Sequence, residues 1–168
     1  MFEKFDCPKV KEIVAGGESR QESVYKALQS RFVEESDMVL VHDSVRPFVD
    51  TKLIRTLIDQ SMSSGAVIPT IPLKDSIKEV NNNRVIKTID RTKFQSVQTP
   101  QVFKKEIIIE AYNRSAKSNI VATDCAFLVE SAGYTVTTVL GSELNFKITT
   151  DIDLRLAELF LDDERTLY

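Results

Sequence analysis

The sequence has no tryptophan, one histidine and two cysteines among its 168 residues. The single histidine, His42, excludes a histidine-rich metal centre and gives little support to a nucleophile–histidine pair. Cys7 and Cys125 form no metal or redox motif, so we expect free thiols in a reducing compartment. No apolar run approaches the length of a membrane span. These absences predict a cytoplasmic protein.

The overall composition is that of an ordinary globular protein, with 42% hydrophobic and 28% charged residues. A formal net charge of −3 argues against a nucleic-acid-binding protein that uses a broad basic face. A chain of 168 residues is long enough to bury one sizeable core. We therefore expect residues 1–168 to form a single domain.

The spacing of apolar residues predicts alternating strands and helices in the first part of the chain. The expected strands are residues 10–14, 38–41 and 66–71, and the run at 38–41 is typical of a fully buried strand. Helices should begin at a capping box formed by Ser19 and Glu22, and at Asp50. Strands and helices in this order predict crossover connections and a parallel sheet, which is an α/β fold.

The pattern changes beyond residue 72. Two short strand-like segments, 75–80 and 84–89, flank three asparagines, and asparagine tolerates left-handed backbone, so we expect a β-hairpin. A two-stranded hairpin is marginally stable alone, which favours packing on another surface such as a second subunit. Helices at 104–115, 124–131 and 152–161 and a strand at 135–140 complete the expected elements.

Two opposite charges, Asp43 and Arg46, follow the strand at 38–41 directly. Ligands of open α/β sheets bind beyond the carboxyl ends of the strands, so these side chains would stand together at the rim of a cleft. Such a pair suits a metal, a phosphate or a sugar hydroxyl. The alternatives are that Asp43 caps a loop and that Arg46 pairs with a surface acid.

Three further segments have both a structural and a functional interpretation. Gly16 and Gly17 form either a tight turn or a site for an anion or a base carbonyl at a helix N-terminus. Lys147, between apolar residues on an expected strand, is either a solvated edge lysine or a phosphate ligand. Arg91 is either a salt-bridge partner or a ligand-binding residue. Asp124 is explained as a helix cap.

Seven ordered segments between about Val14 and Leu161 resemble the 2-C-methyl-D-erythritol 4-phosphate cytidylyltransferase family. They are GGxxRxxSV from Gly16, VHDxxRP from Val41, DSIK from Asp75, DR at Asp90, QTPQ from Gln98, TD at Thr123 and KIT from Lys147. The resemblance implies a nucleotidyltransferase of non-mevalonate isoprenoid biosynthesis that uses CTP, a sugar phosphate and Mg²⁺. It also implies a Rossmann-like sheet with a protruding β-hairpin arm, at about residues 72–91, that forms a homodimer.

The resemblance implies roles for individual residues. Those implied at the nucleotide are Gly16, Gly17, Glu18, Ser23, Asp43, Ser44 and Lys147. Those implied at the second substrate are Arg46, Ser76, Arg91 and Thr99, with Ser76 and Arg91 reaching the substrate of the neighbouring subunit. Asp43, Arg46 and Lys147 are implied in catalysis, because attack of one phosphate on another builds negative charge that fixed cations and Mg²⁺ stabilise. No metal ligand is identified.

The sequence departs from the family pattern in two ways. Family members open with a strand, a glycine-rich loop bearing basic residues and a Pro-Lys pair, and the residues before Asp43 lack this pattern. We therefore expect a chain that is incomplete at its N-terminus and lacks the cradle for the triphosphate. Ser44-Val45 stands where family members commonly have Ala-Ala, and HDSVRP from His42 also resembles the ribitol-5-phosphate cytidylyltransferases, which have the same chemistry. A third hypothesis is a catalytically inactive dimerising fragment.

Overall fold

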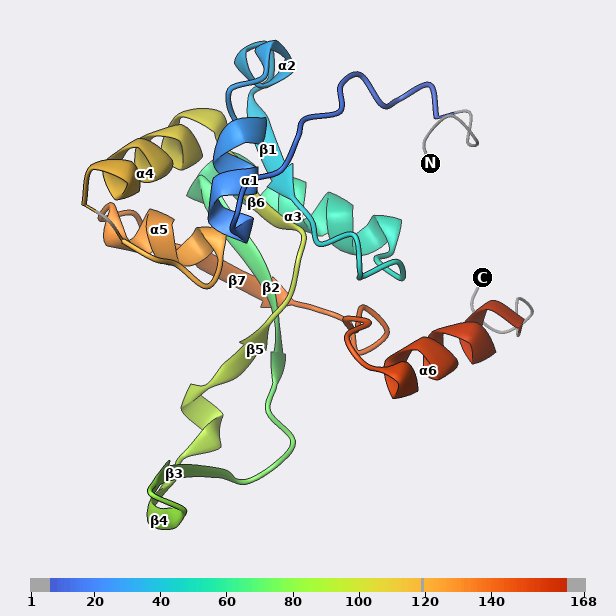
Figure 1. Ribbon diagram of the computed structural model, residues 1–168, viewed down its shortest axis with the longest axis vertical. Coiled ribbons are helices and arrows are strands. Elements are labelled where there is room, and N and C mark those ends of the chain that lie inside the picture. Colours follow the sequence, from blue (N-terminus) through green and yellow to red (C-terminus); the bar gives the residue numbers. More distant parts are fainter. Residues whose placement is uncertain (1–6, 119, 163–168) are drawn as a thin grey trace.

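The computed structural model describes residues 7–118 and 120–162, which form a mixed sheet flanked by helices and a separate hairpin (Figure 1). The strands are β1 (Met38–Val41), β2 (Ala66–Pro72), β3 (Ile77–Asn81), β4 (Arg84–Ile89), β5 (Gln95–Val97), β6 (Gln101–Lys104) and β7 (Thr137–Leu140). The helices are α1 (Arg20–Ala27), α2 (Arg31–Glu34), α3 (Thr51–Ser64), α4 (Lys105–Ser118), α5 (Cys125–Ser131) and α6 (Asp151–Asp162), with a 3₁₀ turn at Arg91–Lys93.

The main sheet has the order β1-β6-β2-β5, and β7 pairs with the other edge of β2. Strand β6 is antiparallel to both β1 and β2, whereas β7 is parallel to β2. Strands β1, β2 and β7 therefore run in one direction, as the crossover pattern predicted. The expectation of a wholly parallel sheet is wrong, because β6 inserts between β1 and β2 in the opposite direction. The α/β class is confirmed.

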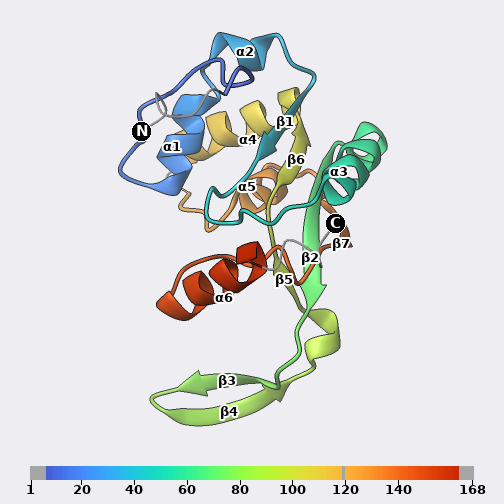
Figure 2. The same cartoon turned by 90° about the vertical axis from the view of Figure 1, so that its right-hand side faces the viewer.

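Two apolar clusters lie on opposite faces of the sheet, because successive side chains of β2 alternate in direction. Ala66 and Ile68 join the cluster that includes residues of α1, α4 and α5. Val67 joins the other cluster, with Leu53 and Leu57 of α3. Figure 2 shows α3 separated from α1, α4 and α5 by the strands. The sheet thus forms the middle of three layers.

The predicted helix starts are confirmed, because each depends on a local hydrogen bond. Ser19, Asp50 and Asp124 each accept a hydrogen bond from the amide three residues later, at 3.1, 2.6 and 2.9 Å. Before α6, the Asp153 carboxylate accepts from the Thr150 amide at 2.8 Å, and the Asp153 amide donates back to the Thr150 hydroxyl at 3.2 Å. These contacts satisfy amides that the first helical turn leaves without a partner.

The strand predicted at residues 10–14 is wrong, and the strand predicted at 38–41 is confirmed but is not fully buried. Residues 10–14 form no strand, and Val10 and Ile13 are 48% and 64% exposed. Strand β1 is only partly buried, with Leu40 39% exposed. Both segments lack neighbouring strands among the described residues, since no strand pairs with segment 10–14 and β1 pairs with β6 alone. Their apolar side chains are therefore left partly exposed.

The predicted hairpin is confirmed as β3 and β4, which pair antiparallel and extend away from the main sheet (Figure 2). Asn82 and Asn83 adopt left-handed backbone, with φ of 48° and 60°, as the turn requires. Val80, Val85 and Ile86 are 56%, 62% and 57% exposed. The described part of the chain therefore leaves the apolar side chains of this hairpin largely uncovered.

Among residues 7–118 and 120–162, no helix combines the length and the apolar character needed to cross a membrane.

Leu57→Ala should lower the free energy of unfolding by about 2 to 5 kcal/mol, because Leu57 is fully buried between α3 and the sheet. Met62→Ala on the same helix is the matched control, since Met62 is 64% exposed and its truncation leaves no cavity. Urea unfolding of both variants measures the difference. Equal losses for the two variants would contradict the assignment of Leu57 to the core.

Candidate active site

Two loops far apart in the sequence are joined just beyond the end of β1. The Ile148 amide donates to the Val45 carbonyl at 2.8 Å, which fixes the loop before α6 against the loop after β1. Lys147 is thereby placed beside Asp43. The prediction that Lys147 lies on a strand is wrong: residues 141–149 form an irregular loop, and the Lys147 side chain is 42% exposed.

The Asp43 carboxylate lies between two cations. Its Oδ1 accepts from Arg20 Nε at 3.2 Å, and its Oδ2 accepts from Lys147 Nζ at 3.0 Å. Burial alone would raise the pKa of Asp43, but the hydrogen bond from Lys147 and the positive charge of Arg20 outweigh burial and lower that pKa below its ordinary value. Asp43 is therefore ionised at neutral pH.

A cavity of about 370 Å³ opens beside this ion-pair cluster. Its lining includes Arg20, Asp43 and Lys147 together with the hydroxyl residues Ser23 and Ser44. Cations, one carboxylate and hydroxyls around one cavity suit a phosphorylated, polyhydroxylated ligand. The structure thus brings four predicted nucleotide residues together and adds Arg20, to which the sequence gave no role.

The glycine turn before α1 is held by its own side chains. The Gly17 amide donates to Ser23 Oγ at 2.9 Å, and the Glu18 amide donates to a Glu22 carboxylate oxygen at 2.7 Å. A Cβ atom at Gly17 would lie 2.5 Å from the Cβ of Glu22, so close approach is the reason for glycine here. Gly16 and Gly17 therefore shape a turn that leads directly to Ser23 at the cavity wall.

Arg46 shares the turn after β1 with Asp43, as expected, but its side chain makes no ion pair with the Asp43 carboxylate. Its Nη1 instead donates to the Asn145 carbonyl at 2.8 Å. Burial lowers the pKa of Arg46, and the charge of Asp43 offsets this only in part. Arg46 Nε is buried and has no hydrogen-bond partner among the described residues. A buried donor of this kind favours an acceptor group supplied by a ligand.

Thr99 is buried directly behind Asp43. Its hydroxyl accepts from the Asp43 amide at 3.0 Å and lies 2.9 Å from His42 Nδ1. The other ring nitrogen, His42 Nε2, lies 3.0 Å from the Arg46 carbonyl. A neutral imidazole protonated at Nε2 satisfies all three contacts. Thr99 and His42 therefore hold the backbone of the Asp43–Arg46 loop in place.

Asn145 and Gln98 were not predicted as site residues. Their side chains hydrogen-bond to backbone carbonyls of the segments that contain Thr99 and Lys147. Asn145 is fully buried, and its amide nitrogen donates to the Thr99 carbonyl at 2.8 Å. The Gln98 amide nitrogen donates to the carbonyls of Ser142 and Asn145 at 2.8 and 3.2 Å. Both residues lie within the sequence segments that contain Thr99 and Lys147, and this position is the signal that could have identified them.

Ser76 and Arg91 do not join the cluster around Asp43 within this chain. Both are exposed at the base of the hairpin, and Arg91 Nη1 donates to the carbonyl of Lys74 in the same segment. In Figure 1 the hairpin lies at the opposite end of the molecule from α1, which carries Ser23. Their predicted role at the substrate of a neighbouring subunit stays a prediction.

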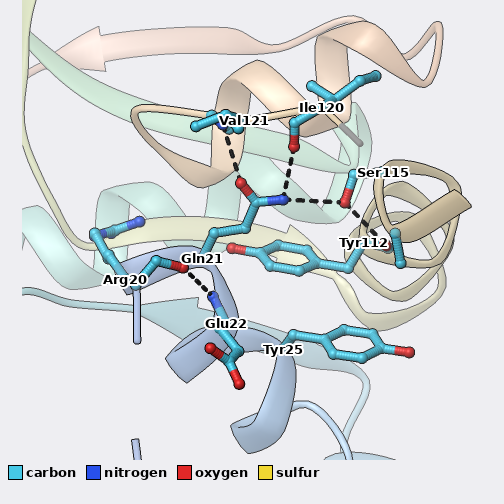
Figure 3. Close-up of a pocket in the computed structure, with 11 residues that line it drawn as sticks. Arg20, Gln21, Glu22, Tyr25, Tyr112, Ser115, Ile120 and Val121 are labelled. Carbon is cyan, nitrogen blue, oxygen red and sulfur yellow. Dashed lines mark hydrogen bonds between the residues drawn. The ribbon is translucent and has the colours of Figure 1, made fainter. Parts of the chain in front are cut away.

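A second cavity, of about 460 Å³, lies between α1, α4 and the loop before α5 (Figure 3). Arg20 lines this cavity as well as the first one. The Gln21 side chain bonds Ser115, the Ile120 carbonyl and the Ala122 amide, at 3.3, 3.0 and 3.0 Å. The Gln21 amide group is therefore fully used in joining α1 to its neighbours.

Within residues 7–118 and 120–162, no group of three or more His, Cys, Asp or Glu residues is placed to hold a metal ion. Among the residues that the structure describes, Asp43 is the one carboxylate that lines the cavity beside Lys147. A single carboxylate fits Mg²⁺ when phosphate oxygens of a ligand and water molecules supply the other ligands. The donor set therefore suits an ion that arrives with a bound triphosphate.

The two cations around Asp43 should make stability depend on pH. Because its pKa is lowered in the folded state, an ionised Asp43 stabilises the fold above the ordinary aspartate pKa of 3.8, and this stabilisation is lost as pH falls through the folded-state pKa. Asp43→Asn should therefore unfold more easily than the unmodified chain near neutral pH, with a difference that closes below about pH 3.8.

Urea unfolding of both proteins across this pH range measures the difference. Asp59→Asn on α3 is the control, since Asp59 is exposed and forms no ion pair within the described residues. A gap that stays constant with pH would refute the double ion pair.

The family model "IspD: 2-C-methyl-D-erythritol 4-phosphate cytidylyltransferase" matches residues 1–163. The chain is 42% identical to the 2-C-methyl-D-erythritol 4-phosphate cytidylyltransferase of Bacillus cytotoxicus over 98% of its own length and 72% of the relative's. It is 44% identical to the enzyme of the same name from Syntrophus aciditrophicus, over 95% of its own length and 68% of the relative's.

Solved structures agree. The 4-diphosphocytidyl-2C-methyl-D-erythritol synthase of Anaerococcus prevotii superposes with a TM-score of 0.84 at 32% identity, over 96% of this chain and 71% of that one. The Thermus thermophilus 2-C-methyl-D-erythritol 4-phosphate cytidylyltransferase superposes with a TM-score of 0.79 at 33% identity, over 93% and 79%. Sequence and fold thus place this chain in the 2-C-methyl-D-erythritol 4-phosphate cytidylyltransferase family of nucleotidyltransferases.

Proposed function

We propose that this chain serves the transfer of CMP from CTP to 2-C-methyl-D-erythritol 4-phosphate. The products are 4-diphosphocytidyl-2-C-methyl-D-erythritol and pyrophosphate, in non-mevalonate isoprenoid biosynthesis. The observation that carries the proposal is the Asp43 carboxylate held between Arg20 and Lys147 at the wall of a cavity. Family membership supplies the identity of the substrates.

In the proposed complex, the cytidine lies against the glycine turn. Gly17 and Glu18 are positioned by hydrogen bonds to Ser23 and Glu22, so the shape of this turn is set before a ligand binds. Gly16 belongs to the same turn, whose carbonyl groups can accept from the amino group of cytosine. The hydroxyls of Ser23 and Ser44 at the cavity wall suit the ribose.

The chemistry is the attack of a phosphate oxygen of the acceptor on the α-phosphorus of CTP, with cleavage of the bond to the β-phosphate. Lys147 is the cation best placed to compensate the charge that develops there, because it is exposed and lines the cavity. Arg46, with its unpaired Nε, and Thr99 are proposed to orient the acceptor. Mg²⁺ bound to the triphosphate would add charge neutralisation.

A homodimer is part of the proposal. The hairpin exposes Val80, Val85 and Ile86, and a second copy of the chain is a partner that would cover them. Ser76 and Arg91 lie at the base of this hairpin, which is at the opposite end of the molecule from α1 (Figure 1). In the dimer they are proposed to complete the acceptor subsite of the partner subunit. A cytoplasmic location is also proposed, supported by the free thiols of Cys7 and Cys125.

The activity test uses a joined protein, in which this chain is fused to the part of the Bacillus cytotoxicus relative that the match leaves uncovered. Pyrophosphate release should require CTP, Mg²⁺ and 2-C-methyl-D-erythritol 4-phosphate together, and ribitol 5-phosphate should not replace the acceptor. Asp43→Asn should lower turnover by at least about 100-fold, comparable to the loss of one transition-state contact. Asp59→Asn is the control. No release with the complete mixture, or release with ribitol 5-phosphate instead, would refute this substrate assignment.

The dimer is tested by complementation in the joined protein. Arg91→Ala and Asp43→Ala subunits should each be nearly inactive alone, and mixed dimers should regain part of the activity, because one of their two sites receives both intact residues. Arg84→Ala, at an exposed arginine of the same hairpin, should keep full activity. Verified mixed dimers that show no rescue would exclude the exchange of Arg91 between subunits.

A further inference from the structure

Arg20 and Lys147 contact the same carboxylate but are held very differently. Arg20 belongs to the first turn of α1, and its side chain is 34% exposed. Lys147 belongs to an irregular loop, and its side chain is 42% exposed. The carboxylate that they share is more buried than either cation, since the Asp43 side chain is 16% exposed.

The guanidinium of Arg20 is also anchored on the side away from Asp43. Its Nη1 lies 3.5 Å from Cys125 Sγ, which in turn lies 3.2 Å from the hydroxyl of Tyr112. Cys125 and Tyr112 are 0% and 2% exposed. Burial raises the pKa of the Cys125 thiol and of the Tyr112 hydroxyl, so both are neutral at neutral pH. Asp43 is therefore the charged partner of Arg20, and the buried Cys125 and Tyr112 fix the direction of the Arg20 guanidinium.

We infer that Arg20 is a positioning residue that keeps Asp43 oriented and charge-compensated, so that Lys147 can leave Asp43 for the α-phosphate of the nucleotide. The role of the phosphate in this inference rests on the proposed function. A carboxylate with one cationic partner holds that partner more strongly than a carboxylate that shares two. Without Arg20, Asp43 would compete with the phosphate for Lys147.

The geometry requires an arginine. Nε contacts Asp43 and Nη1 contacts Cys125, so two nitrogens of one rigid plane link the carboxylate to the buried core. A lysine at position 20 would carry the same charge on a single nitrogen and could not make both contacts. Arg20→Lys therefore separates the contribution of charge from that of orientation.

The first test is made on the chain itself, without substrate. Carboxyl-carbon NMR of ¹³C-labelled aspartate, with the Asp43 signal assigned from Asp43→Asn, follows its titration. Arg20→Gln should raise the pKa of Asp43, and Arg20→Lys should raise it less. Arg55→Gln, at an exposed arginine of α3 that forms no ion pair within the described residues, should leave the Asp43 titration unchanged. The inference is overturned if Arg20→Gln, in folded protein, titrates like the unmodified chain.

The second test uses the joined protein. Arg20→Gln and Arg20→Lys should both lower kcat by about tenfold or more, whereas the Kd for cytidine, which carries no phosphate, should change less than about twofold, because the glycine turn and Ser23 are retained. Equal losses in cytidine binding and turnover would instead show a disrupted turn and overturn the positioning role. If the unmodified joined protein releases no pyrophosphate, the proposed function fails, and the NMR titration alone decides the contact between Arg20 and Asp43.

Discussion

Strand β2 is the element on which the rest of the structure depends, because it has partners along both edges. β6 pairs with its first residues and β5 with its last along one edge, and β7 pairs along the other. Pro69 lies where the first edge changes partner from β6 to β5, and its carbonyl accepts from the Gln98 amide. The N–H and C=O of one strand residue point to the same edge, so the missing N–H of Pro69 faces a break in the ladder.

The change of partner at Pro69 also determines where the site can form. The chain between β5 and β6, which includes Gln98 and Thr99, lies at this break and is buried. Its side chains and carbonyls are thus available to the loops above the sheet: Gln98 holds the loop before α6, and Thr99 holds the loop after β1. The ion-pair cluster around Asp43 therefore follows from backbone pairing in β2 as much as from the charges themselves.

The features that could be predicted from the sequence depend on neighbours a few residues apart. The caps at Ser19, Asp50 and Asp124 each involve an amide three residues away, and the hairpin depends on adjacent asparagines at its turn. Their physics is contained in a short window of sequence. The family resemblance extended this to the placement of Lys147 in one site with Asp43, from which it lies far away in the sequence. No local pattern distinguished Lys147 from a solvated surface lysine, and its role at the phosphate stays a prediction.

The features that could not be predicted depend on pairings between distant segments. Strand β6 is a short apolar segment whose direction is fixed only when β1 and β2 are both in place, and the expected parallel sheet left it out. The contact of Arg20 with Asp43 spans 23 residues, and that of Arg46 with Asn145 spans 99. Charge alone favoured Asp43 with Arg46, but burial and the Asn145 carbonyl directed Arg46 elsewhere.

The residues proposed at the nucleotide and those proposed at the acceptor are held in place in different ways. The residues proposed at the nucleotide lie on α1, at the end of β1 and on the loop of Lys147, and hydrogen bonds and ion pairs within one chain hold these segments together. Residues implied at the acceptor are split, with Arg46 and Thr99 in the body and Ser76 and Arg91 on the hairpin. The hairpin has no core of its own, and its apolar side chains are exposed. The position of the hairpin therefore depends on the surface that covers those side chains. The completeness of the proposed acceptor half depends on that surface as well.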